Sequence, residues 1–196
     1  MKAFVNILSI FRIFAAFAIV PLLLGEFFAA AFVLFVAAAA TDWLDGFLAR
    51  KFDVVTKIGG VLDHIGDKFL VANALVMSAV YLQVWQVLLP AVLMLCRELY
   101  VSGLREFMGT EKIEMPVPKD RFALGKIKTF VQMASLAGIF LWIWVAGSAP
   151  SAAAGTFGYC MLLGGIGGLW LALALALLSA GIYTREFIGN LEKIKK

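Results

Sequence analysis

Charged residues are scarce in this sequence. Of its 196 residues only 15% are Asp, Glu, Lys or Arg, whereas 63% are hydrophobic, and the mean hydropathy is +0.95. Soluble domains contain roughly 45–50% apolar residues, so the composition excludes an ordinary soluble protein and indicates an integral membrane protein. The length predicts a single membrane domain over residues 1–196, with no room for a separate soluble module of usual size.

Cysteine is rare as well. The two cysteines, Cys96 and Cys160, lie in apolar runs and have no C-x-x-C spacing. This pattern favours small hydrophobic residues over a disulfide or a metal site.

Basic residues are absent from three long stretches, and the last of these, residues 129–184, has no acidic residue either. Each stretch can hold two membrane spans of about 20 residues, or one span and part of another. A cleaved signal peptide is the alternative for the first apolar run, but no soluble mature domain follows it. The sequence predicts an all-α fold with six transmembrane helices, at 1–25, 27–49, 59–82, 86–108 and two within 129–184 around a Gly-, Pro- and Ser-containing loop at 147–156.

The seventeen Lys and Arg residues indicate the orientation of these helices. They lie near the N-terminus, the connector after the second helix, the loop after the fourth helix, or the C-terminus. Basic residues concentrate on the cytoplasmic side of membrane proteins. Both termini are therefore predicted to be cytoplasmic.

Four aspartates lie inside or beside apolar segments. Asp42 and Asp45 are three residues apart, and Asp63 and Asp67 are four apart, so each pair shares one face of its helix. The connector between the helices is short, so the two acidic faces can meet near the cytoplasmic surface. Because an ionised carboxylate in a membrane is costly unless it is paired, the four acids require a cation.

Two kinds of cation can meet this need. Clustered carboxylate oxygens suit Mg²⁺ or Mn²⁺, of which two ions could be held, and these metals also bind substrate phosphates. The alternative is that each Asp forms a separate ion pair with a nearby base such as Arg50, Lys57 or Lys68.

Residues beside the acids point to a phosphorylated ligand. Gly46 and Gly59 leave the helix surface bare, which lets a phosphate or nucleotide approach the backbone, although glycines also serve helix packing. Arg50 lies one turn after Asp45, where a guanidinium can hold phosphate through two hydrogen bonds.

The pattern D-x-x-D-G-x-x-A-R, followed by eight residues and G-x-x-x-D-x-x-x-D, resembles the signature of the CDP-alcohol phosphotransferase family. Eight fixed positions are met: Asp42, Asp45, Gly46, Ala49, Arg50, Gly59, Asp63 and Asp67. Between the last two acids, His64 and Gly66 stand where relatives often have Ala or Pro. We expect His64 to face a neighbouring helix or the membrane interface.

The resemblance implies roles for these positions. The four aspartates would hold a pair of divalent metal ions, and Asp67 would also take the proton from the acceptor hydroxyl. Gly46, Ala49, Arg50 and Gly59 would line the site for cytidine diphosphate (CDP). The reaction would be attack of an alcohol on the phosphoryl group attached to diacylglycerol, with release of CMP.

A second basic region concerns the acceptor alcohol. Arg97 and Arg105 are eight residues apart and share a helical face. They can pair locally with Glu98 or Glu106, or they can form a pocket for an acceptor phosphate together with Lys126 and Lys128. With N-I-L-S-I-F-R at residues 6–12, this region resembles the branch of the family whose acceptor is glycerol 3-phosphate.

The expected protein is thus a transferase of phospholipid biosynthesis in a bacterial cytoplasmic membrane, with its active site facing the cytoplasm. Its partners would be CDP-diacylglycerol, glycerol 3-phosphate and membrane lipid, with no nucleic acid. The alternatives are an inositol-phosphate or serine acceptor and, more remotely, a metal or proton transporter. Gly164 and Gly168 permit close helix contact, either inside the protein or at a homodimer seam.

Overall fold

The computed structural model describes the backbone of residues 2–52, 57–110 and 119–194, and the side chains of residues 7–41, 59–110 and 127–189. Over these residues the chain consists of helices joined by short turns, with no strands. The helices in chain order are α1 (Lys2–Leu24), α2 (Phe28–Phe52), α3 (Lys57–Leu82), α4 (Trp85–Thr110), α5 (Lys119–Ser148), α6 (Pro150–Ala153) and α7 (Thr156–Ile194).

The predicted all-helical membrane fold is confirmed. Apart from α6, each helix corresponds to one predicted span, and α6 is a short turn of helix inside the predicted loop at 147–156. Proline is favoured at the start of a helix because its missing N–H needs no partner there, and Pro150 begins α6.

Five of the described helices are long and apolar enough to cross a membrane: α1, α3, α4, α5 and α7. In α2 the apolar segment within the described side chains is shorter, at Phe28–Thr41. The protein is therefore a multi-pass membrane protein. The number of six spans and the cytoplasmic location of the termini stay predictions.

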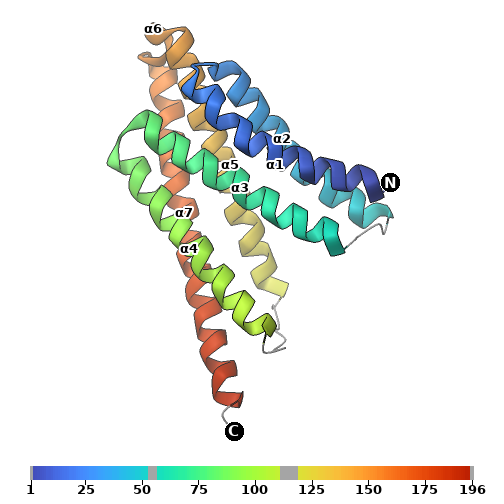
Figure 1. The fold of residues 1–196 in the computed structure, drawn as a ribbon. Coiled ribbons are helices and arrows are strands. Elements are labelled where there is room, and N and C mark those ends of the chain that lie inside the picture. Colours follow the sequence, from blue (N-terminus) through green and yellow to red (C-terminus); the bar gives the residue numbers. More distant parts are fainter. Residues whose placement is uncertain (1, 53–56, 111–118, 195–196) are drawn as a thin grey trace.

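The long helices run alternately up and down the bundle (Figure 1). The turns after α1 and α3, and helix α6, lie at one end of the bundle (Figure 1). From this end the helices diverge: α1, α2 and α3 extend to one side, and α4, α5 and α7 extend downward to the C-terminal end of α7. The end of α2 and the start of α3, which carry the aspartates, lie near the start of α1.

The side chains buried between the helices differ from those on the outer surface of the bundle. The buried core contains many small residues such as Ala16, Ala38 and Ala74, which let helices approach closely, and the rings of Phe35 and Phe140 fill the space between α2 and α5. Large apolar residues point outward from most helices; Phe157, for example, is 76% exposed. Helices in lipid associate mainly through close packing and interhelical hydrogen bonds, so a core of small residues inside an apolar exterior is expected.

Helices α5 and α7 approach closely at two glycines of α7. A Cβ atom on Gly165 would lie 2.8 Å from Cγ1 of Ile139 and 3.2 Å from the carbonyl oxygen of Ser135, and one on Gly168 would lie 2.3 Å from Oγ of Ser135. A Cβ atom on Gly164 would meet nothing within 4 Å. Of the two glycines singled out in the sequence, Gly168 therefore packs inside the protein, whereas Gly164 does not.

Gly165→Ala should lower the free energy of unfolding by about 1–3 kcal/mol, because the added methyl group overpacks the contact with α5. Unfolding of the purified protein in detergent, followed by circular dichroism, measures this loss. The matched control is Gly164→Ala, which adds the same methyl group in open space and should unfold like the parent protein. Equal stability of the two variants would show that the α5–α7 contact is not tight at Gly165.

Candidate functional site

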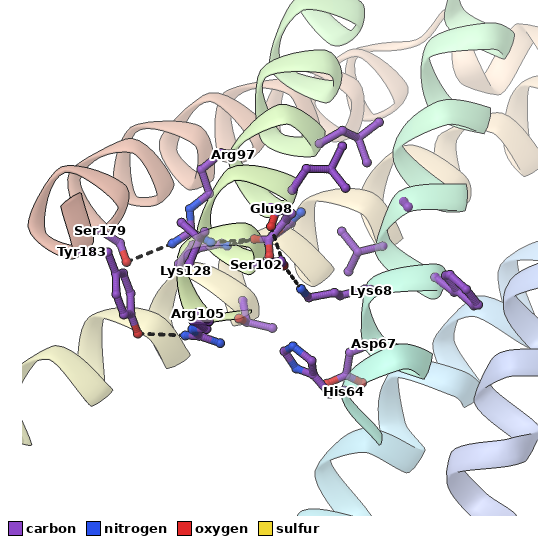
Figure 2. Close-up of a pocket in the computed structure, with 18 of the residues that line it drawn as sticks. His64, Asp67, Lys68, Arg97, Glu98, Ser102, Arg105, Lys128, Ser179 and Tyr183 are labelled. Atoms are coloured by element: carbon purple, nitrogen blue, oxygen red, sulfur yellow. Dashed lines mark hydrogen bonds and ion pairs between the residues drawn. The ribbon is translucent and has the colours of Figure 1, made fainter. Parts of the chain in front are cut away.

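A cavity of about 570 Å³ lies between α3, α4, α5 and α7 (Figure 2). Small-molecule sites typically have volumes of about 300–1,000 Å³. Its polar lining consists mainly of charged and hydroxyl groups: His64, Asp67 and Lys68 from α3, Arg97, Glu98, Ser102 and Arg105 from α4, Lys128, Thr129 and Gln132 from α5, and Ser179, Tyr183 and Glu186 from α7. The cavity can therefore hold a small polar ligand.

Asp67, one member of the acidic pair of α3, lines this cavity. Asp63 and Asp67 each accept a hydrogen bond through Oδ1 from the same nitrogen, Nη1 of Arg12, at 2.7 and 2.6 Å. Arg12 lies on α1 and its side chain has no exposed surface, whereas those of Asp63 and Asp67 are 43% and 33% exposed. The two carboxylates thus converge on one cation inside the bundle.

Sequence reasoning missed Arg12, although one signal indicated it. Arg12 follows an apolar run and precedes a long stretch without basic residues, and an arginine inside a membrane helix requires an anion. Of the bases considered as separate ion-pair partners of the aspartates, Lys68 donates a hydrogen bond to Oγ of Ser102. The side chains of Arg50 and Lys57 lie outside the described residues.

Two of the four aspartates predicted to bind metal, Asp63 and Asp67, lie close together. Because Oδ1 atoms of Asp63 and Asp67 both lie within 2.7 Å of one nitrogen, the two side chains can contribute to a single cation site. Carboxylate oxygens are the ligands that Mg²⁺ and Mn²⁺ prefer. No group of three or more potential ligands comes together among the described side chains, so a complete metal site needs further ligands.

Helix α2 carries the remaining residues of the motif. Asp42, Asp45, Gly46, Ala49 and Arg50 lie on its described backbone, but their side chains are outside the described residues. Their roles as metal ligands and as the CDP site remain predictions. Gly59, the fourth predicted CDP residue, is buried near the start of α3.

The side chain of His64 lines the cavity next to Asp67 (Figure 2). Residues of the neighbouring helix α4 line the same cavity, so this position is compatible with the expectation that His64 faces a neighbouring helix.

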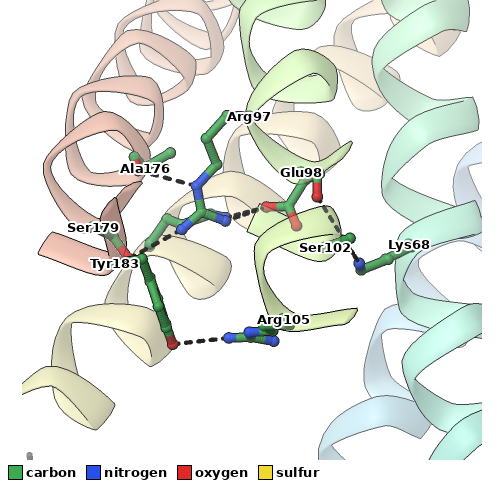
Figure 3. Close-up of polar contacts among 9 residues, drawn as sticks. Lys68, Arg97, Glu98, Ser102, Arg105, Ala176, Ser179 and Tyr183 are labelled. Carbon is green, nitrogen blue, oxygen red and sulfur yellow. Dashed lines mark hydrogen bonds and ion pairs between the residues drawn. The ribbon is translucent and has the colours of Figure 1, made fainter. Parts of the chain in front are cut away.

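Arg97 has several partners inside the bundle (Figure 3). Nε donates to the carbonyl oxygen of Ala176 at 3.1 Å, Nη2 to Oγ of Ser179 at 3.0 Å, and Nη1 to Oε1 of Glu98 at 2.8 Å. The local Arg–Glu pair considered as an alternative is therefore present. Oε1 of Glu98 also accepts a hydrogen bond from Nζ of Lys128, so one carboxylate serves two cations.

Arg105 is the accessible basic residue of α4 in this cavity. Its side chain is exposed, Nη2 donates to the hydroxyl of Tyr183 at 2.8 Å, and the guanidinium lies 5.1 Å from the centre of the Tyr183 ring. Cation–π contacts of this kind orient a guanidinium without neutralising its charge. Arg105 is thus held in place with its charge available to a ligand.

The structure brings together three of the four residues predicted to bind an acceptor phosphate. Arg97, Arg105 and Lys128 all line the cavity, while the side chain of Lys126 lies outside the described residues. Sequence reasoning missed the polar residues that α7 contributes, Ser179 and Tyr183, because they lie in a segment read only as membrane span. Their helical spacing of four residues was the available signal.

Glu98→Gln should lower the free energy of unfolding by roughly 2 kcal/mol, because the neutral amide leaves the charges of Arg97 and Lys128 without their counter-ion. Breaking a fully buried ion pair costs ~3–5 kcal/mol, and the estimate is lower here because the Glu98 side chain is 28% exposed. Chemical denaturation in detergent measures the change. Glu106→Gln, the same substitution at an exposed position of α4, is the control and should have little effect. A cost at Glu98 no greater than at Glu106 would contradict the ion-pair account.

Comparison with known proteins identifies the family. The model of the CDP-alcohol phosphatidyltransferase family matches residues 3–180. The chain belongs to this family. Members of the family generally depend on a divalent metal ion, which agrees with the carboxylates that converge at the start of α3.

Two similar relatives illustrate the match. A CDP-diacylglycerol–glycerol-3-phosphate 3-phosphatidyltransferase of Yersinia enterocolitica is 46% identical over 110 residues, which are 56% of this chain and 59% of the relative. A protein of the same name from Escherichia coli K12 is 44% identical over 119 residues, 59% of this chain and 64% of the relative. The matched region thus spans about three fifths of the length of these relatives.

Proposed function

We propose that the protein transfers the phosphatidyl group of CDP-diacylglycerol to glycerol 3-phosphate, which gives phosphatidylglycerophosphate and CMP. The observation that supports this most directly is the basic cavity beside Asp67, in a chain whose relatives carry the name of this activity. An acceptor that carries a phosphate fits such a cavity better than a neutral alcohol does.

The charges around the cavity favour an anionic acceptor. Its lining has four basic side chains, Lys68, Arg97, Arg105 and Lys128, against three acidic ones, Asp67, Glu98 and Glu186. Asp67 is additionally paired with Arg12. The net positive charge of the lining attracts an anion.

We assign direct contact with the acceptor phosphate to Arg105, because its guanidinium is exposed and Tyr183 holds it in place. Arg97 and Lys128 share Glu98 as their counter-ion, and they contribute mainly positive potential. Lys126 is assigned to the same pocket from the sequence alone.

Asp67 is the proposed general base. Its carboxylate lines the cavity and is partly exposed, so it can accept the proton of an acceptor hydroxyl as the oxygen attacks phosphorus. Arg105 lies across the cavity from α3 (Figure 2), so a phosphate bound there would direct the other end of glycerol 3-phosphate toward Asp67.

Asp42, Asp45, Asp63 and Asp67 are the proposed ligands of two Mg²⁺ or Mn²⁺ ions. When bound, the metals polarise the phosphoryl group and neutralise the charge that develops on the leaving CMP. Gly46, Ala49, Arg50 and Gly59 are proposed to line the CDP site on α2 and α3. The site would lie on the cytoplasmic side of a bacterial inner membrane, as the distribution of basic residues predicts.

Purified protein should release CMP from CDP-diacylglycerol when glycerol 3-phosphate and Mg²⁺ or Mn²⁺ are present, and removal of the metal with EDTA should abolish the release. Product analysis by chromatography identifies the lipid formed. Inositol phosphate and serine, tested in parallel, distinguish the alternative acceptors. Release with one of these alcohols but not with glycerol 3-phosphate would overturn the assigned acceptor, and release that persists in EDTA would overturn the metal assignment.

In the same assay Asp67→Asn should abolish turnover, because it removes the base and one metal ligand. Glu26→Gln is the matched acid-to-amide control. Glu26 lies in the turn between α1 and α2, at the end of the bundle away from the acidic pair (Figure 1), and its variant should retain parental activity. Near-parental turnover of the Asp67 variant would contradict the proposed mechanism.

Arg105→Ala should raise the KM for glycerol 3-phosphate by about 10–100-fold, because a hydrogen bond to a charged group contributes about 1.5–3 kcal/mol. The KM for CDP-diacylglycerol should change little. Steady-state kinetics with each substrate varied in turn measure both values, and Arg105→Lys should recover part of the loss. An equal rise in the two KM values would show that Arg105 has only a structural role.

A further inference from the structure

Arg12 connects α1 to the acidic pair of α3 from inside the bundle. One nitrogen, Nη1, donates to Oδ1 of Asp63 at 2.7 Å and to Oδ1 of Asp67 at 2.6 Å. The partners are 51 and 55 residues away in the sequence, so the contact depends on how α1 packs against α3. A single side chain thus fixes one oxygen of each carboxylate.

The packing of α1 on α3 holds Arg12 in this position. Gly66 lies between the two acids, and a Cβ atom there would already be 3.4 Å from the carbonyl oxygen of Ser9 and 3.6 Å from Cβ of Arg12. One turn further along α1, the carbonyl oxygen of Ala16 accepts a hydrogen bond from Nδ2 of Asn73 at 2.8 Å. The backbone of α1 around Arg12 is therefore fixed against α3.

Arg12 requires its anionic partners in every state of the protein. A guanidinium does not lose its proton in proteins, and the side chain of Arg12 has no exposed surface. A buried charge that loses its counter-ion is strongly unfavourable. Breaking the contacts of the buried Arg12 guanidinium with Asp63 and Asp67 would therefore cost free energy, which favours an ion pair that persists when a metal binds.

The two sides of the acidic pair differ in accessibility. Arg12 approaches from the closed interior, whereas Asp63 and Asp67 retain exposed surface and Asp67 lines the cavity. A carboxylate has two oxygens and can accept from Arg12 through one while the other faces the open side. In metal sites, ligating carboxylates are commonly oriented by hydrogen bonds of this kind.

We propose that Arg12 is a positioning residue for the metal site: it holds the inner oxygens of Asp63 and Asp67 so that their outer oxygens face the metal and the substrate. This inference rests on the proposed function, because it takes the two aspartates as metal ligands. It differs from a competition model, in which Arg12 occupies the metal position and leaves when the metal binds. The two models predict opposite changes in metal affinity when Arg12 is replaced.

The test is direct Mn²⁺ binding to the purified full-length protein in detergent, measured without substrates by electron paramagnetic resonance. Arg12→Gln removes the charge and should raise the Kd for Mn²⁺ by about 10–100-fold, the usual effect of losing a partner that orients a ligand. Arg12→Lys keeps the charge on a side chain with a different reach and should raise the Kd less. Arg185→Gln, which removes one exposed positive charge from α7, is the control and should bind Mn²⁺ like the parent protein.

The outcomes separate the inference from the function on which it rests. If the parent protein does not bind Mn²⁺, the metal assignment fails, and the role of Arg12 fails with it. If the parent protein binds Mn²⁺ and the Arg12 variants bind it equally well or more tightly, only the role of Arg12 is overturned, and tighter binding establishes competition. Should Arg12→Gln not fold, Arg12→Lys decides alone, because an unchanged or lower Kd in that variant also contradicts positioning.

Discussion

A charge inside a helical bundle in a membrane has to meet a partner, and this constraint organises the structure. Arg12 meets Asp63 and Asp67, and Arg97 and Lys128 meet Glu98. The three basic side chains have almost no exposed surface. The helices that carry them therefore have to pack with the carboxylates opposite. The two ion-pair groups therefore fix the relative positions of α1 with α3 and of α4 with α5.

The same constraint separates the site into two parts with different chemistry. At the start of α3 two carboxylates, Asp63 and Asp67, share the guanidinium of Arg12, so this part of the site is suited to cations. On the opposite side, the basic lining residues outnumber the acidic ones, so this part favours an anion; the basic residues are Arg97, Arg105 and Lys128, and the acidic ones are Glu98 and Glu186. In the proposed reaction a metal-bound donor and a phosphorylated acceptor would meet along the line that joins these two parts. Neither part could exchange its role with the other without leaving buried charge uncompensated.

Much of this arrangement could be predicted from the sequence. The helix positions follow from long apolar runs and turn residues, and the shared face of Asp63 and Asp67 follows from helical geometry alone. The pairing of Arg97 with Glu98 was one of two readings that the spacing left open. What the sequence could not supply was contact between helices: the approach of α1 to α3 at Gly66, and of α7 to Arg97 and Arg105, depends on packing between segments more than 50 residues apart.

The apolar wall of the cavity has a consequence of its own. Beside the charged groups, the lining includes Phe69 and Leu99, whose side chains are 41% and 74% exposed on the outer surface of α3 and α4. The cavity lining thus combines apolar side chains that reach the exposed surface of the helices with charged side chains. A molecule with acyl chains could remain in the bilayer while its headgroup enters, and a water-soluble molecule could arrive without crossing lipid. If the proposed function holds, a lipid donor and a water-soluble acceptor could thus reach one cavity from different surroundings.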